Sequence, residues 1–367
     1  MNPDERANAL KVTATDGLHG TGMGFVALLT VLPLLFSKLG AGKVEIGVLS
    51  AIGVAGFILG QPLGMLVLGR RRRTKHFFVR WVLFAWTGTH LAMGAVLYFL
   101  APGAPPLCRY VLLALFAAIT FGDGMLLPIW VDWQGALFSR QSRGRAMGMI
   151  AGAWAFGQGL GSLGAGAIQG SLPFPLDYSL LFLLAAVLFA SSVNFTWRVR
   201  EPESITRDRE SFEVADLWGF LRQSLRQANF RSYMVARVLL GIGGGAALFY
   251  SVHFRSADGG GVGEGAVIKL GALLAFSQFG ASNVLGRLGD RMGHKRAVAL
   301  GSLAQAAAIA VAFVGSGWLA CAACFAVLGV SWSSGWVSHN NMLFETCPHG
   351  HRVAHIALSN ALLGPFV

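Results

Sequence analysis

Long apolar segments alternate with short polar ones along nearly the whole chain. Most apolar runs have about 20 residues, the length that an α-helix needs to cross the ~30 Å hydrocarbon core of a bilayer. No water is available there for the backbone, so each run is expected to be a helix. The expected helices cover residues 12–36, 44–68, 77–100, 109–133, 145–169, 177–197, 231–254, 264–286, 297–315 and 317–341, and an eleventh begins within 353–367.

The composition supports this pattern. Hydrophobic residues make up 54% of the 367 residues and charged residues 13%, whereas an ordinary soluble domain is about 25% charged. A soluble protein of this length has no core large enough to bury so much apolar surface. The sequence therefore predicts an all-α polytopic membrane protein, with the polar start Met1 to Lys11 as a short tail.

The net charge of +12 is distributed over alternate loops. One set of loops holds Arg70 to Arg73, Arg140 to Arg145, the long segment 198–230 and the residues from Arg287 to Arg296; the opposite set holds only Lys38, Lys43, Arg109, Arg255 and Lys269. Basic loops remain in the cytoplasm. We therefore expect a cytoplasmic amino terminus in a cell inner membrane and no nucleic-acid partner. Segment 198–230 is expected to join two halves, 1–197 and 231–367.

The turn expected between helices 264–286 and 297–315 has a distinctive sequence. It contains Gly286, Asp290, Arg291, Gly293, Lys295 and Arg296. Glycines allow a tight turn, and the Asp290 carboxylate can accept hydrogen bonds at a helix N-terminus or pair with an arginine. In the first half, Gly64, Arg70 and Arg71 occupy the corresponding place, and Leu68 replaces the acid.

This order of glycine, Asp-Arg, glycine and basic residues resembles the loop signature of the major facilitator superfamily. The glycine-rich run from Gly157 to Gly166 is similar to that family's helix-5 motif, although Ser162 stands where the motif has proline. The resemblance covers essentially the whole chain, and is to bacterial members. It implies two six-helix halves and a secondary transporter working by alternating access. A member would continue through a twelfth helix, so we expect a chain truncated at its C-terminal end.

The resemblance also implies which residues line the central cavity, because helices 1, 4, 7 and 10 surround it in this family. The polar candidates on these helices are Asp123, Asp16, His19, Tyr250, His253, Trp332, Trp336, His339 and Asn340. A carboxylate in the middle of a membrane is costly. Asp123 is therefore expected to carry a proton or to balance a cationic solute; alternatively, it is a structural acid held by neighbouring helices.

The other candidates have alternative interpretations. Asp16 and His19 lie one turn apart, where they serve as a gate, transfer protons or have a structural role. The strip from Trp332 to Asn340 cradles a ligand or consists of interfacial aromatics. Gly157, Gly161, Gly164 and Gly166 have the spacing of a helix-packing face.

The sequence contains no nucleophile–base pair and no phosphate-binding glycine loop, so no enzyme activity, cofactor or metal is expected. We predict a monomer that moves a small solute, driven by protons. The Asp290 turn is expected to stabilise one of its two states. The alternative is a non-transporting membrane sensor, scaffold or assembly factor of the same fold.

Overall fold

The computed structural model describes residues 1–68, 74–139, 142–201, 214–335, 342, 359–360 and 362–363. These residues form helices and no strand. Eight segments of this part are long and apolar enough to cross a membrane. The all-α polytopic fold expected from the sequence is therefore confirmed.

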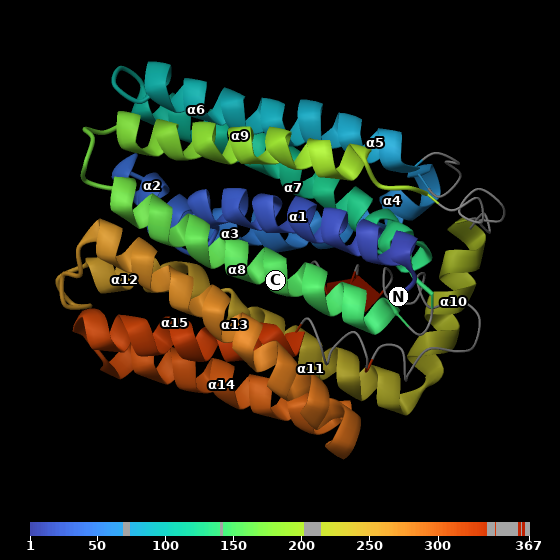
Figure 1. Ribbon diagram of the computed structural model, residues 1–367. Helices are drawn as coiled ribbons and strands as arrows, with labels where there is room; N and C mark the ends of the chain where they lie inside the picture. The colour runs from blue at the N-terminus through green and yellow to red at the C-terminus, as the bar shows by residue number, and fades with distance from the viewer. Residues whose placement is uncertain are drawn as a thin grey trace.

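The residues before 201 form one bundle, drawn from blue to yellow-green in Figure 1. Its elements are α1 (Pro3–Phe25), α2 (Val31–Lys38), α3 (Lys43–Ala51), η1 (Ile52–Gly56), α4 (Phe57–Leu68), α5 (Thr74–Trp81), η2 (Val82–Thr87), α6 (Gly88–Leu100), α7 (Pro105–Ala136), α8 (Arg143–Ile168) and α9 (Leu176–Trp197). The elements η1 and η2 are π-helical turns inside two of the spans.

The residues after 214 form a second group, drawn from yellow to red (Figure 1). It contains α10 (Val214–Arg226), α11 (Ala228–Gly244), α12 (Ala247–Arg255), α13 (Glu264–Met292), α14 (His294–Val314) and α15 (Gly317–Ser334). The two groups meet mainly through α8 and α13. We call the end of the molecule that carries the N-terminus the N-terminal face, and the opposite end the distal face.

Two expected helices are interrupted. The run 12–36 is not one helix, because α1 ends at Phe25 and α2 begins at Val31. Pro33 explains the break: in a continuous helix its ring would clash with the carbonyl of Leu29, whereas proline is tolerated in the first turn of a new helix. The run 231–254 divides into α11 and α12 next to Gly243, Gly244 and Gly245, which are poor helix formers.

Two other boundaries differ from the prediction. The polar start is helical rather than a tail, because the Asn2 side chain and Glu5 cap α1 reciprocally. The helix expected to end at residue 286 continues to Met292. The turn to α14 is then made at Gly293, whose φ of 86° is the left-handed conformation that glycine adopts readily.

Helices α1 and α8 pack closely along their length. A Cβ atom on Gly157 would lie 2.2 Å from the carbonyl oxygen of Gly17, and one on Gly161 would lie 2.0 Å from that of Thr21. These helices touch through their backbones, which small residues allow in membranes.

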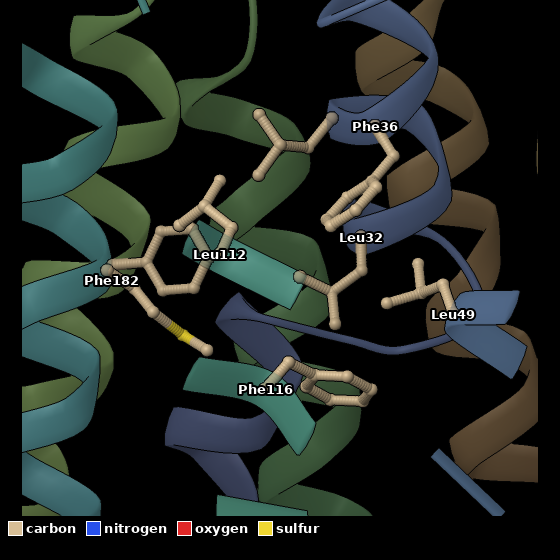
Figure 2. Close-up of a pocket in the computed structure, with 8 residues that line it drawn as sticks. Leu32, Phe36, Leu49, Leu112, Phe116 and Phe182 are labelled. Atoms are coloured by element: carbon tan, nitrogen blue, oxygen red, sulfur yellow. The ribbon is translucent and has the colours of Figure 1, made fainter. Parts of the chain in front are cut away.

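Apolar side chains fill the space between α2 and its neighbours α3, α6, α7 and α9 in the first bundle. Figure 2 shows the small gap that remains there, lined by Met93 and by leucines and phenylalanines that include Leu32, Leu112 and Phe116. Its free volume is about 10 Å³, at the lower limit of what one water molecule needs. It is a packing gap within the first bundle and offers no polar group to a ligand.

Candidate functional site

Asp123 lies on α7 between two glycines. A Cβ on Gly122 would lie 2.5 Å from the Trp81 ring, and one on Gly124 would lie 2.0 Å from the carbonyl oxygen of Phe57. The glycines therefore let the spans containing α4 and α5 approach the helix on both sides of the carboxylate. A larger residue at either position would push these neighbours away from Asp123.

The carboxylate of Asp123 is held by two indoles. Trp86 donates its Nε1–H to Oδ1 over 2.5 Å, and Trp81 donates more weakly to the same oxygen over 3.5 Å. Trp86 lies in η2 and Trp81 directly precedes it. A π-helical turn inside an α-helix often marks a functional position, and here it carries the closer donor to Asp123.

Two histidines contact the Trp86 ring. His19 on α1 meets it edge-on with ring centroids 4.3 Å apart, and His90 on α6 stacks on it at 5.6 Å with only 9° between the planes. Nδ1 of His90 lies 2.8 Å from the Trp86 carbonyl oxygen. A carbonyl only accepts, so this contact requires the proton on Nδ1 and leaves Nε2 as a hydrogen-bond acceptor.

Asp16 lies on α1 one turn before His19. Its Oδ2 accepts a hydrogen bond from Gln134 of α7 over 3.2 Å. The structure therefore brings Asp16, His19 and Asp123 into the interface between α1, α7 and the span containing η2, inside the first bundle. Asp123 faces that span and is not among the residues that line the cavity between the two groups of helices.

That cavity lies beside the break between α1 and α2. Its lining comes from both groups: Ala27, Leu28, Leu29, Thr30, Gln158, Ser162, Gly271, Leu274, Ala275 and Trp332. Its free volume is about 50 Å³, several times the roughly 10–15 Å³ that one water molecule needs. The candidate Trp332 on α15 therefore contributes to a space between the halves.

Thr30 is the most informative residue of the lining. It is 3% exposed, and its Oγ1 has no hydrogen-bond partner within the described part of the chain. Its methyl group faces α13, where a Cβ on Gly271 would lie 2.6 Å away. A buried hydroxyl without a partner is costly, and a ligand in the cavity would supply the missing bond. Gln158 and Trp332 add an amide and an indole.

The family model described as "Major Facilitator Superfamily" matches residues 17–365. The chain belongs to the major facilitator superfamily. No curated protein matches the sequence, but many solved structures match the fold. The family membership makes this chain a membrane transporter.

Three solved transporters are similar in structure to this facilitator. Their sequence identity to it is so low that the similarity shows only a shared fold. A variant of the nucleoside transporter NupG is 15% identical with a TM-score of 0.72, and the match covers 98% of this chain and 88% of NupG. An inward-facing bacterial homologue of the human lysosomal transporter Spinster is 13% identical with a TM-score of 0.68, and the match covers 100% and 80%. An auto-inhibited peptide transporter of the POT family is 15% identical with a TM-score of 0.62, and the match covers 97% and 87%.

The other candidate residues of this facilitator lie in different parts of the structure. Tyr250 and His253 lie on α12, and neither the Tyr250 hydroxyl nor His253 Nε2 has a partner among the described residues. Gly64 lies inside α4, where a Cβ would meet the Met125 carbonyl oxygen at 1.8 Å. Gly164 faces Phe25, and Gly166 faces the backbone of α13.

Some predicted positions lie outside the part of the chain that the structure describes. Trp336, His339, Asn340, Arg70 and Arg71 lie outside the described residues, and the side chain of Asp290 lies outside the described side chains, as does any contact of Gly286. Arg291 lies in the last turn of α13, Gly293 forms the turn, and Lys295 and Arg296 lie in the first turn of α14.

Sequence reasoning missed the partners of the acid in this facilitator. Trp81, Trp86 and His90 were not selected, because they lie on the third span, which the family resemblance places away from the central cavity. Thr30 was missed because the break between α1 and α2, which places it beside the cavity, was not predicted. Pro33 was the available signal for that break.

Proposed function

We propose that this facilitator moves a small uncharged solute across the inner membrane by alternating access, driven by protons carried at Asp123. The single observation that supports the solute site is the cavity between the two groups of helices at the α1–α2 break. Transporters built from repeats typically bind substrate near the membrane midplane, next to discontinuous helices. The halves 1–197 and 231–367 would then rock about this cavity, with the N-terminal face in the cytoplasm.

The chemistry of the cavity favours a solute without charge. Its described lining contains hydroxyl, amide and indole groups among apolar side chains, and no charged side chain. A buried ion without an opposite charge is strongly disfavoured, whereas hydroxyl or amide groups of a solute would pair with Thr30 and Gln158.

The surroundings of Asp123 favour the proton role over the counter-ion role. Its described hydrogen-bond donors are two neutral indoles in the first bundle, away from the solute cavity. Transfer of a proton to this carboxylate would remove a charge inside the membrane.

The test is flux in proteoliposomes that contain the full chain under an imposed pH gradient. A labelled nucleoside and a labelled hexose serve as uncharged probes, and choline and lactate as charged ones. We expect saturable uptake of an uncharged probe that is lost in Thr30→Val and kept in Thr30→Ser, because only serine retains the hydroxyl. Uptake of charged probes alone would reject the solute class. Absence of any protein-dependent flux would favour the sensor, scaffold or assembly-factor alternative.

A further inference from the structure

The distal face carries a cluster of charged and polar side chains contributed by both halves. Lys38 at the end of α2, Gln169 after α8, and Asp177 and Tyr178 at the start of α9 belong to the first half; Arg255 at the end of α12 and Glu264 at the start of α13 belong to the second. The side chain of Asp177 is 2% exposed and that of Glu264 is 13% exposed. These carboxylates are therefore largely removed from water.

The contacts across the two halves in this cluster converge on Glu264. Its Oε2 lies 3.5 Å from Lys38 Nζ, and its Oε1 accepts a hydrogen bond from the Tyr178 hydroxyl. With its amide nitrogen turned toward the carboxylates, Gln169 also donates to Glu264 over 3.3 Å. Three groups of the first half thus bind one carboxylate of the second half.

The backbones of the two halves also approach closely beside this cluster. A Cβ on Gly166 of α8 would lie 2.5 Å from the Gly265 carbonyl oxygen, and one on Gly265 would lie 2.7 Å from that of Gly166. Gly265 follows Glu264 directly in the chain. The halves are therefore closed against each other at the point where Glu264 binds across them.

Each half keeps an ion pair of its own within the cluster. Lys38 Nζ lies 3.5 Å from Asp177 Oδ2 in the first half, and Arg255 Nη2 lies 3.5 Å from Glu264 Oε2 in the second. If the halves separated here, Lys38 would retain Asp177 and Glu264 would retain Arg255. Leaving a buried charge without a partner is the large cost of breaking such clusters, and this arrangement avoids it.

We propose that Glu264 is the latch of the distal entrance: its contacts to Lys38, Tyr178 and Gln169 hold the entrance shut, and it exchanges these contacts for Arg255 alone when the entrance opens. The two states of an alternating-access cycle must differ by only a few kcal/mol. Exchange of partners within a neutral cluster meets this requirement because both states keep every charge paired. The proposal adds a closing device to the proposed transport cycle and assigns it to a residue.

Distance measurement by double electron–electron resonance tests this latch without any solute. The full chain in lipid nanodiscs carries spin labels at Gly103→Cys in the first half and Gly263→Cys in the second, with the four native cysteines replaced by alanine. A Cβ at either glycine meets no atom within 4 Å. We expect one short distance in this background. In Glu264→Gln we expect a longer distance whose population rises about tenfold, as loss of charge-assisted bonds predicts.

The matched control is Glu45→Gln. Glu45 pairs with Arg109 over 2.9 Å near the same face, but both residues belong to the first half. This substitution should leave the distance distribution unchanged. An unchanged distribution in Glu264→Gln, or equal opening in Glu45→Gln, would overturn the latch.

A second variant covers the case in which Glu264→Gln does not fold. Tyr178→Phe removes one hydroxyl donor to Glu264 and keeps the ring, so it should open the distal entrance in the same direction by a smaller factor. No increase of the long distance in a monodisperse Tyr178→Phe sample would overturn the proposal. A missing solute flux would count against the proposed function and not against the latch.

Discussion

The Nε1 atom of Trp86 lies 2.5 Å from Oδ1 of Asp123, a full 1.0 Å closer than the 3.5 Å of the Trp81 bond to the same oxygen. The two indoles come from one span, on either side of the start of a π-helical turn. Among the described residues the carboxylate has neutral donors and no ion-pair partner. Gain or loss of a proton at Asp123 therefore directly changes the strength of the Trp86 bond, since a charged acceptor forms the stronger hydrogen bond.

We predict that Trp86→Phe lowers pH-driven solute accumulation several-fold, because it removes the closer donor and keeps an aromatic ring between His19 and His90. Trp81→Phe is the matched control in the same span and should have a smaller effect. The measurement is the steady-state accumulation ratio in proteoliposomes under a fixed pH gradient. Equal effects of the two substitutions would contradict the special role of Trp86.

Asp123→Asn should abolish accumulation driven by a pH gradient and leave exchange of solute across the membrane intact. The amide preserves the size of the side chain and cannot carry the coupling proton. Uptake under a pH gradient and counterflow without a gradient separate the two activities in one preparation. Full accumulation by this variant would reject Asp123 as the proton carrier.

The fold was largely predictable because membrane helices are determined by the length and hydropathy of local segments. The breaks between α1 and α2 and between α11 and α12 were not predictable, because the residues around them are as apolar as the helices. Only Pro33 and the run Gly243 to Gly245 mark them. The motif at Gly286 to Arg296 was correctly located but its shape was wrong: α13 runs to Met292 and leaves the turn to Gly293.

The candidate site was predictable only in part. Asp123 was selected as a candidate because an acid is expensive inside the membrane, and this reason depends on one residue and its position alone. Its partner Trp86 and the nearby His90 depend on which helices pack together and on the π-helical turn that orients them. The charges of Lys38 and Glu264 were visible in the sequence, but their contact joins residues 226 positions apart and depends on how the two halves dock.

Gly161→Ala should destabilise the protein by about 1–3 kcal/mol, the range for overpacking a well-packed contact. The added methyl group would lie 2.0 Å from the carbonyl oxygen of Thr21, so α8 and α1 would have to separate. Gly148→Ala is the control on the same helix, because a Cβ there meets nothing within 4 Å. It should be neutral or slightly stabilising. Thermal unfolding in detergent measures both, and an equal effect would contradict the packing role.

We predict that Glu5, which caps α1 at the N-terminal face, makes the stability of the protein depend on pH. Its Oε1 accepts from the Ser139 backbone N–H over 2.7 Å and its Oε2 from that of Asn2 over 2.9 Å. These bonds favour the charged form and lower the pKa of Glu5 from 4.5 to about 2, the Ser139 bond most strongly. A pKa lowered by folding contributes stability that is complete above the unfolded value of 4.5 and is lost as the pH falls toward about 2.

Wild type should therefore unfold at a higher temperature than Glu5→Gln at pH 7, and this difference should shrink as the pH falls below about 4.5. The neutral glutamine lacks the charge that strengthens both bonds at every pH. Asp4→Asn is the control on the same helix turn, because Asp4 pairs with the exposed Arg200 instead of the Ser139 backbone. Thermal melting curves of wild type, Glu5→Gln and Asp4→Asn from pH 7 to pH 3 test this prediction. A difference that grows as the pH falls would mean that the Ser139 contact does not favour charged Glu5.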